Sequence, residues 1–376
     1  MGHEEEKATI AFHAGSKTKN IICFTWRVKF MGLLSGVSAF FGLDIGSSAL
    51  RVVELSGNGA QKVLFKYAYM PIDNKIALSD SKNDQQRLSH AIAQLITQAK
   101  LSTKNVAVGI PSARVFTTIA DIDRLPPREL EKSIHYQAEA LIPTPLNESK
   151  IDWAPLGDSP VDKTKVEILL TSVPNDFIER RLDIVESVGL NVVAFEPDNL
   201  ALARALTPPE ATFAHMIIDI GQMSTNLVIV YGGMPKLTRS IPTGMEAIIR
   251  SAIQNLNVDE KQAEQFVLKF GLSKDKLEGQ VYDAIISSVE LLATEIEKSI
   301  KFFQTRYTSA KLDRIIVTGG GSVLPEFPLF LANKFALNVE IGNAWRNVQF
   351  AADRQNELLS ISNQFSVAVG LAERNE

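Results

Sequence analysis

Two stretches of the sequence place an aspartate directly before a glycine and small hydroxyl residues. The first is Gly42–Leu55, GLDIGSSALRVVEL, in which Asp44 is followed by Gly46, Ser47 and Ser48. Apolar residues flank a small turn on both sides, which predicts a strand, a tight turn and a second strand. Glycine can adopt a positive φ there without steric cost. Clustered N–H groups in such a turn bind phosphate, and the carboxylate can hold Mg²⁺ through water.

A second stretch, Met216–Tyr231, repeats this pattern as MIIDIGQMSTNLVIVY. Its aspartate, glycine and hydroxyl residues are Asp219, Gly221, Ser224 and Thr225. A glycine turn follows the apolar strand predicted for Arg314–Thr318 and consists of Gly319, Gly320 and Gly321. One such hairpin alone is more often only structural. Two acid-bearing turns followed by a glycine turn indicate a nucleotide bound between two similar domains.

The ordered trio resembles the phosphate-1, phosphate-2 and adenosine motifs of the actin-like ATPase superfamily. Within it, the short chain and the segment DIGSSALRVVEL resemble the PilM family of type IV pilus assembly, which is similar to the cell-division protein FtsA. The resemblance covers roughly residue 40 to the C-terminus. It implies an α/β fold of the actin-like ATPase type, with two related domains around a nucleotide cleft. It also implies an FtsA-like 1C subdomain instead of the 1B subdomain of actin.

The resemblance implies ATP and Mg²⁺ as ligands. Asp44 and Asp219 would hold the hydrated metal ion, and Arg51 stands where actin-like proteins often have a phosphate-contacting lysine. An arginine grips phosphate as a planar fork rather than as a point charge. The phosphate-cradling residues would be Gly46, Ser47, Ser48, Gly221, Ser224 and Thr225.

Three further roles follow from the same resemblance. Gly319–Gly321 would let the backbone pass close to the adenosine, and Glu264 resembles a ribose-contacting glutamate. FtsA-like proteins often have a lysine three residues later, where this chain has Val267, with Lys269 nearby. Glu196, in a Glu-Pro pair, would position the attacking water. The alternative for Glu196 is a carboxylate that merely suits a helix N-terminus.

The length, net charge, cysteine count and motifs of the chain argue against several classes of function. The 376 residues allow two or more domains, and a net charge of −4 without a long basic run argues against a nucleic-acid partner. A single cysteine, Cys23, rules out an intrachain disulfide and fits a reducing cytosol. The sequence has no Walker A motif and no dinucleotide-binding glycine fingerprint after the first strand.

The N-terminal residues 1–40 form an extension before the first motif. Its uncharged apolar part, Phe30–Leu43, is shorter than the roughly 20 residues that span a bilayer. A signal peptide ending near Val37-Ser38-Ala39 is one alternative, and surface tethering of Leu33–Phe41 is a weaker one. We prefer a start at Met31, because family members begin shortly before the first hairpin.

The periodicity and the resemblance together predict an order of subdomains. Within the 1C region, we expect a loop that contains Pro143, Pro145, Pro155 and Pro160 and leads to a strand over Lys165–Ser172. A long helix is expected over Val281–Tyr307. The predicted ranges are 41–111 (1A), 112–194 (1C), 195–213 (connecting helix), 214–243 (2A), 244–310 (2B), 311–360 (2A) and 361–376 (C-terminal helix returning to 1A).

The resemblance implies a cytoplasmic, ATP-binding assembly protein with slow or absent hydrolysis. Its implied partner is the short N-terminal cytoplasmic tail of PilN, which would hold it at the inner membrane, with PilO contacted indirectly. Homo-oligomer formation stays open. One alternative is a small-metabolite kinase of the sugar-kinase branch, but no acid stands in a convincing catalytic position. Another is an FtsA-like filament, against which the polar end Glu373-Arg374-Asn375-Glu376 argues.

Overall fold

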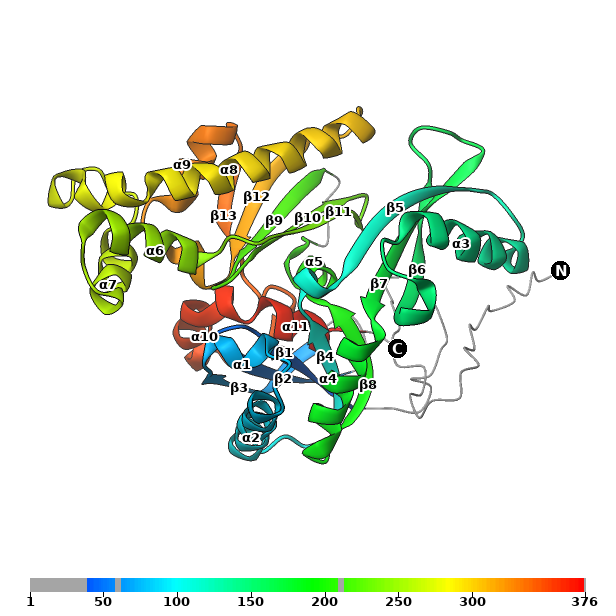
Figure 1. Ribbon diagram of the computed structural model, residues 1–376, viewed down its shortest axis with the longest axis horizontal. Helices are drawn as coiled ribbons and strands as arrows, with labels where there is room; N and C mark the ends of the chain where they lie inside the picture. Colours follow the sequence, from blue (N-terminus) through cyan, green and yellow to red (C-terminus); the bar gives the residue numbers. More distant parts are fainter. Residues whose placement is uncertain (1–38, 58–61, 209–212, 375–376) are drawn as a thin grey trace.

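The computed structural model describes residues 39–57, 62–208 and 213–374. The expectations for residues 1–38, including a start at Met31 and most of the apolar run, lie outside the described residues. Within the described part, three β-sheets carry the helices on their faces (Figure 1).

The first sheet is built around the first aspartate motif. Its strand order is β14-β3-β2-β1-β4-β8, with β1, β2 and β3 antiparallel and β4 and β8 parallel to β1. The strands are β1 Phe41–Ile45, β2 Ala49–Ser56, β3 Lys62–Pro71, β4 Asn105–Ile110, β8 Asn191–Pro197 and β14 Val348–Gln349. Apolar residues on both faces of the central strands allow helices to cover the sheet on both sides.

The second sheet repeats this arrangement with the second aspartate motif. Its order is β11-β10-β9-β12-β13, again with three antiparallel strands followed by two parallel ones. The strands are β9 Ala214–Ile220, β10 Thr225–Tyr231, β11 Met234–Ile241, β12 Leu312–Thr318 and β13 Asn338–Ile341. The two aspartates therefore occupy equivalent central strands, which confirms the prediction of two related domains.

The small sheet, β5-β7-β6, belongs to the region predicted as 1C. It consists of β5 Phe116–Asp123, β6 Ser149–Asp158 and β7 Lys165–Pro174. The expectation of a loop across Pro155 was wrong, because β6 is an edge strand. Ile151 and Trp153 pack toward the core of the small sheet, and the pairing is irregular between Pro155 and Gly157. Proline is tolerated at such an edge and bulge because no ladder hydrogen bond is lost.

The predicted range 112–194 contributes to two cores. Helix α4 (Asn175–Ser187) packs against helix α2 (Lys82–Ala99), and its Phe177 and Leu182 belong to the core under the first sheet. β8 is itself a strand of the first sheet. The small sheet and helix α3 (Pro127–Leu141) thus form the separate unit, which lies at the right of Figure 1.

The helices agree largely with the predicted pattern. Ser81 caps α2, Asp259 caps α7, and the long α8 matches its expected range within one residue at each end. Helix α1, the strands β13 and β14, and helix α10 were not predicted. The helices are α1 Asn74–Leu78, α2 Lys82–Ala99, α3 Pro127–Leu141, α4 Asn175–Ser187, α5 Asp198–Leu206, α6 Met245–Leu256, α7 Glu260–Phe270, α8 Gln280–Arg306, α9 Phe327–Phe335, α10 Gln355–Ile361 and α11 Ser366–Ala372.

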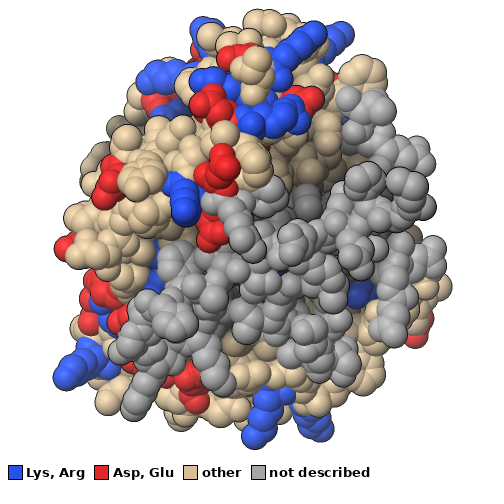
Figure 2. All heavy atoms as spheres, turned by 90° about the vertical axis from the view of Figure 1, so that its right-hand side faces the viewer, with Lys and Arg blue, Asp and Glu red and all other residues tan. Residues whose placement is uncertain are grey.

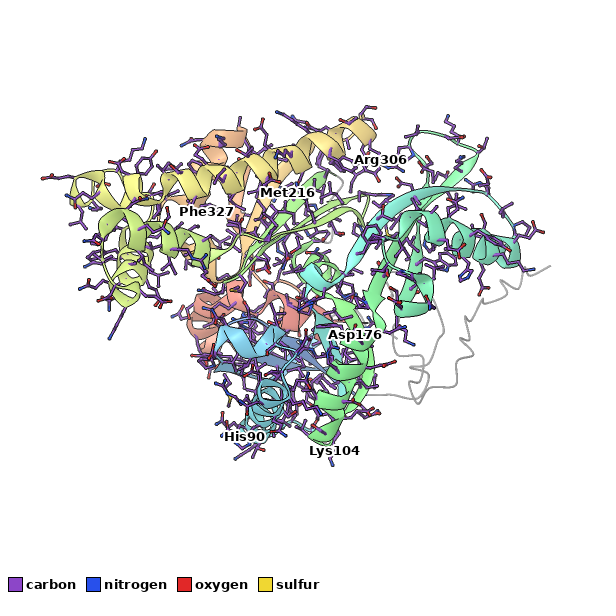
Figure 3. The ribbon with its side chains drawn as sticks, in the orientation of Figure 1. His90, Lys104, Asp176, Met216, Arg306 and Phe327 are labelled. Atoms are coloured by element: carbon purple, nitrogen blue, oxygen red, sulfur yellow. The ribbon has the colours of Figure 1, made fainter. Side chains whose placement is uncertain are left out.

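Side chains fill separate cores in the two halves. Met216 of β9 and Phe327 of α9, labelled in Figure 3, are both buried in the core of the second half. On the face in Figure 2, charged side chains of both signs are interspersed over the upper part. None of the described helices is both long and apolar enough to cross a membrane.

Helices α5 and α11 cross between the two main sheets. They share one core with residues of both halves, including Val53 of β2 and Val228 of β10. A Cβ at Gly370 would lie only 1.9 Å from the carbonyl oxygen of Ala201. The crossing therefore requires a glycine, because no side chain fits between the two backbones.

Gly370→Ala is expected to lower the free energy of unfolding by about 2 kcal/mol or more, because overpacking forces the two helices apart. Urea unfolding followed by circular dichroism measures this change. Gly320→Ala is the matched control, since no atom lies within 4 Å of a Cβ built there. Equal stability of the two variants would contradict the proposed close packing.

Candidate functional site

The two aspartate turns have the same hydrogen bond. The N–H of Gly46 donates to the carbonyl of Ala49 at 3.1 Å, and the N–H of Gly221 donates to that of Ser224 at 3.0 Å. Gly46 does not have the positive φ that its residue type permits. The glycine is needed here because there is little room for a side chain. A Cβ there would lie 3.0 Å from the Ala49 oxygen and 3.1 Å from Arg51 Nη1.

Asp44 and Arg51 are cross-strand partners in the hairpin. Arg51 Nη1 donates to Asp44 Oδ2 at 3.2 Å, and both side chains are largely buried. The Nε of Arg51 is buried and has no hydrogen-bond partner among the described residues. A buried donor without a partner is costly. An anion beside the guanidinium would satisfy this donor, as a phosphate does.

Asp219 lies opposite Asp44 in the second turn. Burial, and then the negative charge of Asp44, raise the pKa of Asp219 to about 6. Burial also raises the pKa of Asp44, although Arg51 acts in the opposite direction. Two buried carboxylates that repel each other at neutral pH create a demand for a cation. A hydrated Mg²⁺ fits this donor set, because it prefers carboxylate and phosphate oxygens.

The glycine turn packs directly onto the second aspartate. Gly319 has a φ of +82°, and a Cβ there would lie 2.3 Å from Asp219 Oδ1. Asn363 secures the turn, because its carbonyl accepts from the N–H of Gly319 at 2.7 Å and its Nδ2 donates to the Gly319 carbonyl at 3.0 Å. The structure thus brings the second and third motifs into contact.

The other residues that are predicted to bind the nucleotide differ in their burial and contacts. Ser47 and Ser224 are half-buried, and Ser48 is exposed in the first turn. The hydroxyl of Thr225 is buried and donates to the carbonyl of Thr243 at 2.7 Å. Glu264 is exposed on α7. Gly320 faces open space, whereas Gly321 packs against Ile220; the roles of these residues stay predictions.

Glu196 is enclosed by two arginines. Its carboxylate is 1% exposed and accepts from both Nη atoms of Arg204 and from Nη1 of Arg374, the last at 3.0 Å. Burial acts to raise the pKa of Glu196. The combined effect of Arg204 and Arg374 is larger and opposite, so the pKa lies below its usual value. This arrangement links the start of α5 to the chain that follows α11 and pairs the Glu196 carboxylate with two cations.

Asp198, which sequence reasoning did not select, is the acid of this stretch whose pKa responds to both motif aspartates. It is the first residue of α5, and a Cβ at Gly109 would lie 2.7 Å from its Oδ1. Burial, and then the charges of Asp44 and Asp219, raise its pKa well above the usual value. Its position two residues after Glu196, in Glu-Pro-Asp, is the signal that could have identified it.

Asp219→Asn is expected to stabilise the nucleotide-free protein at high pH only. The pKa of Asp219 rises from 3.8 to about 6 on folding, so its favourable contribution is complete below pH 3.8 and is lost as the pH rises through about 6. The variant should gain up to about 3 kcal/mol at pH 8 relative to pH 4. Thermal unfolding in EDTA at both values measures this difference, and a gain independent of pH would contradict it.

Comparisons with known proteins agree with this geometry. The chain is similar to the protein in a solved "PilM-PilN type IV pilus biogenesis complex", with 26% identity and a TM-score of 0.76 over 89% of this chain and 97% of that chain. It shares its fold with ethanolamine utilization protein EutJ from Carboxydothermus hydrogenoformans (15% identity, TM-score 0.54, 88% of each chain). It also shares it with MreB5 of Spiroplasma citri bound to ADP (13%, TM-score 0.52, 88% of this chain and 94% of that one).

These neighbours confirm the expected actin-like ATPase fold, while the FtsA-like character of the small sheet stays a prediction. A family model described as type IV pilus assembly protein PilM matches residues 42–376, which begin at the first aspartate hairpin. The chain therefore belongs to the PilM family of type IV pilus assembly proteins.

Proposed function

We propose that the chain is an ATP-binding assembly protein that binds its partner in a nucleotide-dependent way. The observation that carries this proposal is threefold: the two aspartate turns share one hydrogen-bond pattern, the glycine turn packs onto Asp219, and Arg51 beside Asp44 has a buried Nε without a hydrogen-bond partner among the described residues. Together they offer phosphate-binding donors and carboxylates that require a cation.

In this proposal, Asp44 and Asp219 hold a hydrated Mg²⁺, which supplies charge neutralisation for the phosphates. Arg51 would donate to a phosphate oxygen, and the backbone amides of the two turns would supply further donors to the phosphates. The glycine turn at Gly319–Gly321 contacts the adenosine, and Glu264 contacts the ribose.

We assign the role of positioning the attacking water to Asp198 rather than to Glu196. Glu196 is paired with Arg204 and Arg374, so its charge is already used inside the protein. The charges of Asp44 and Asp219 raise the pKa of Asp198, which supports a place for its carboxylate on the side of the two aspartate turns. A raised pKa makes the Asp198 carboxylate a stronger proton acceptor, which suits a residue that orients an attacking water.

Nucleotide binding and turnover test these roles. Asp44→Ala and Asp219→Ala should weaken Mg-ATP binding at least tenfold, because each removes a carboxylate that holds the metal ion. Asp198→Asn should retain binding and lower turnover, whereas Glu196→Gln should mainly lower thermal stability. Isothermal titration and phosphate release measure these effects. Rapid turnover that a sugar stimulates would instead support a metabolite kinase.

The proposed partner is the N-terminal cytoplasmic tail of PilN, by analogy with the solved complex of a protein 26% identical to this chain. Binding this tail would place the chain in the cytoplasm, at the inner membrane through its partner. A cavity of about 180 Å³ between the first half, the small sheet and the second half is a candidate docking place. It is lined by Ser112, Val115, Phe116, Thr117, Pro197, Asn199, Thr238, Arg239 and Ser240.

The cavity has features that suit an extended peptide. Oδ1 of Asn199 is buried and has no hydrogen-bond partner among the described residues. A peptide N–H could donate to it, since a buried acceptor without a partner is costly. Phe116 offers an apolar wall, and the hydroxyls of Ser112 and Thr238 offer polar contacts beside it.

Phe116→Ala is expected to weaken binding of a PilN tail peptide about tenfold, because it removes an apolar wall of the cavity. Fluorescence anisotropy with a labelled peptide, in the presence of Mg-ATP, measures the affinity. Phe302→Ala is the matched control, since this phenylalanine is 68% exposed on α8. Equal affinities of both variants would place the peptide elsewhere.

A further inference from the structure

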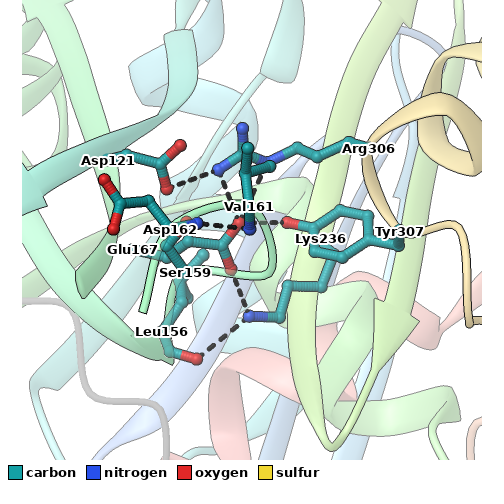
Figure 4. Close-up of polar contacts among 9 residues, drawn as sticks. All are labelled: Asp121, Leu156, Ser159, Val161, Asp162, Glu167, Lys236, Arg306 and Tyr307. Atoms are coloured by element: carbon teal, nitrogen blue, oxygen red, sulfur yellow. Dashed lines mark hydrogen bonds and ion pairs between the residues drawn. The ribbon is translucent and has the colours of Figure 1, made fainter. Parts of the chain in front are cut away.

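A carboxylate is buried at the boundary between the small sheet and the second half. Glu167 of β7 is fully buried and accepts four hydrogen bonds from three side chains (Figure 4). Lys236 Nζ donates at 2.6 Å, Arg306 Nε and Nη2 at 2.9 and 2.8 Å, and the Tyr307 hydroxyl at 2.7 Å. We call these four residues the Glu167 cluster.

The Glu167 cluster joins elements that are distant in sequence. Lys236 belongs to β11, and Arg306 ends α8, both in the second half (Figures 1 and 3). Further contacts extend the same boundary. Arg306 Nη2 also binds Asp121 of β5 at 2.7 Å, and Lys236 Nζ also donates to the carbonyl of Leu156 at 3.0 Å.

The physical character of the cluster makes it a two-state contact. Loss of Glu167 from this arrangement leaves Lys236 without its anion and Arg306 with Asp121 alone, and removal of Lys236 leaves a buried carboxylate short of a donor. Breaking a buried ion pair by removing one partner is strongly unfavourable. The hydrogen bonds of Glu167 are therefore formed together or replaced by water together. A contact of this kind has two states, bound and open, and few intermediate ones.

One face of β11 connects this cluster to the cavity. Lys236, Thr238 and Ser240 alternate along the strand and so project from the same face. Lys236 binds Glu167, whereas Thr238 and Ser240 line the cavity. A displacement of β11 relative to the small sheet changes both places at once.

The same strand is tied to the nucleotide cleft. β11 pairs in regular register with β10 from Thr225–Ile241, directly after the second aspartate turn, to Ile229–Leu237, and the pairing is irregular at the adjacent Lys236. A hydrogen-bonded pair of strands moves as one unit. Movement of the turn at Gly221–Ser224 is thereby transmitted to Lys236 and to the cavity wall.

We propose that the Glu167 cluster is a latch that holds the small sheet against the second half and couples the state of the nucleotide cleft to the cavity. The identity of the cavity's ligand rests on the proposed function, whereas the holding of the small sheet does not. The latch regulates partner binding without touching either ligand.

The test compares Glu167→Gln and Lys236→Met with the wild type in the full chain. Spin labels at Lys132→Cys on α3 and Lys261→Cys on α7, with Cys23→Ser, report the distance between the small sheet and the second half by pulsed electron resonance. Both lysines are exposed. Arg124→Gln is the control, because Arg124 pairs with Asp158 on the exposed surface of the same unit. Circular dichroism verifies folding, and Lys236→Met serves if Glu167→Gln does not fold.

Both latch variants should at least double the width of the distance distribution, while Arg124→Gln keeps the width of the wild type. The ratio of peptide affinities with and without Mg-ATP should fall toward one in the latch variants, with nucleotide binding retained. An unchanged width, or a broadened distribution with an unchanged ratio, overturns the proposal. If the wild type binds neither ATP nor the peptide, the proposed function fails, and the widths alone decide whether the latch holds the small sheet.

Discussion

The close crossing of α5 and α11 is the constraint on which the rest of the structure depends. The backbone of Gly370 lies directly against that of Ala201. The two helices are so close that no side chain fits between them at this point. Arg204 of α5 donates to the carbonyl of Gly370 at 2.6 Å and also binds Glu196. Apolar contacts from both halves surround this polar centre. The two sheets are thereby held at one relative position, with their aspartate turns facing each other.

That position creates an electrostatic conflict which a ligand can resolve. Burial raises the pKa of Asp44, Asp198 and Asp219; the charge of Asp44 raises that of Asp219 further, and the charges of both raise that of Asp198, while Arg51 acts in the opposite direction on Asp44 and Asp219. Structural stability alone would not select three mutually repelling acids in one cleft. Perturbed acids of this kind cluster at functional sites. The arrangement is understandable if a magnesium nucleotide completes it, as the proposed function requires.

A second buried charge lies at the other boundary of the molecule. Glu167 is satisfied by donors from the second half, so polar contacts hold the small sheet together with a small apolar cluster that includes Leu169 and Met234. Such contacts are specific in direction and break together. The α5–α11 crossing is instead mostly apolar and tightly packed, which suits a permanent axis. The protein thus combines a rigid axis with a boundary that can switch.

The sequence by itself determined the features that depend on neighbouring residues. Both aspartate turns, the glycine turn and the long helix α8 were predicted, because local spacing and residue type decide turns and helical periodicity. Family membership followed from the same motifs. The local pattern failed at Pro155, where burial of Ile151 and Trp153 at a sheet edge outweighed the proline.

Only the tertiary structure decided which acids act together. Glu196 and Asp198 are two residues apart and look equivalent in the sequence. Arg374 approaches from the far end of the chain and neutralises Glu196, while Asp198 turns toward Asp44 and Asp219. The latch at Glu167 likewise depends on donors from β11 and from the end of α8. Such contacts join distant segments, and a charge is paired or exposed according to which segments the fold brings to it.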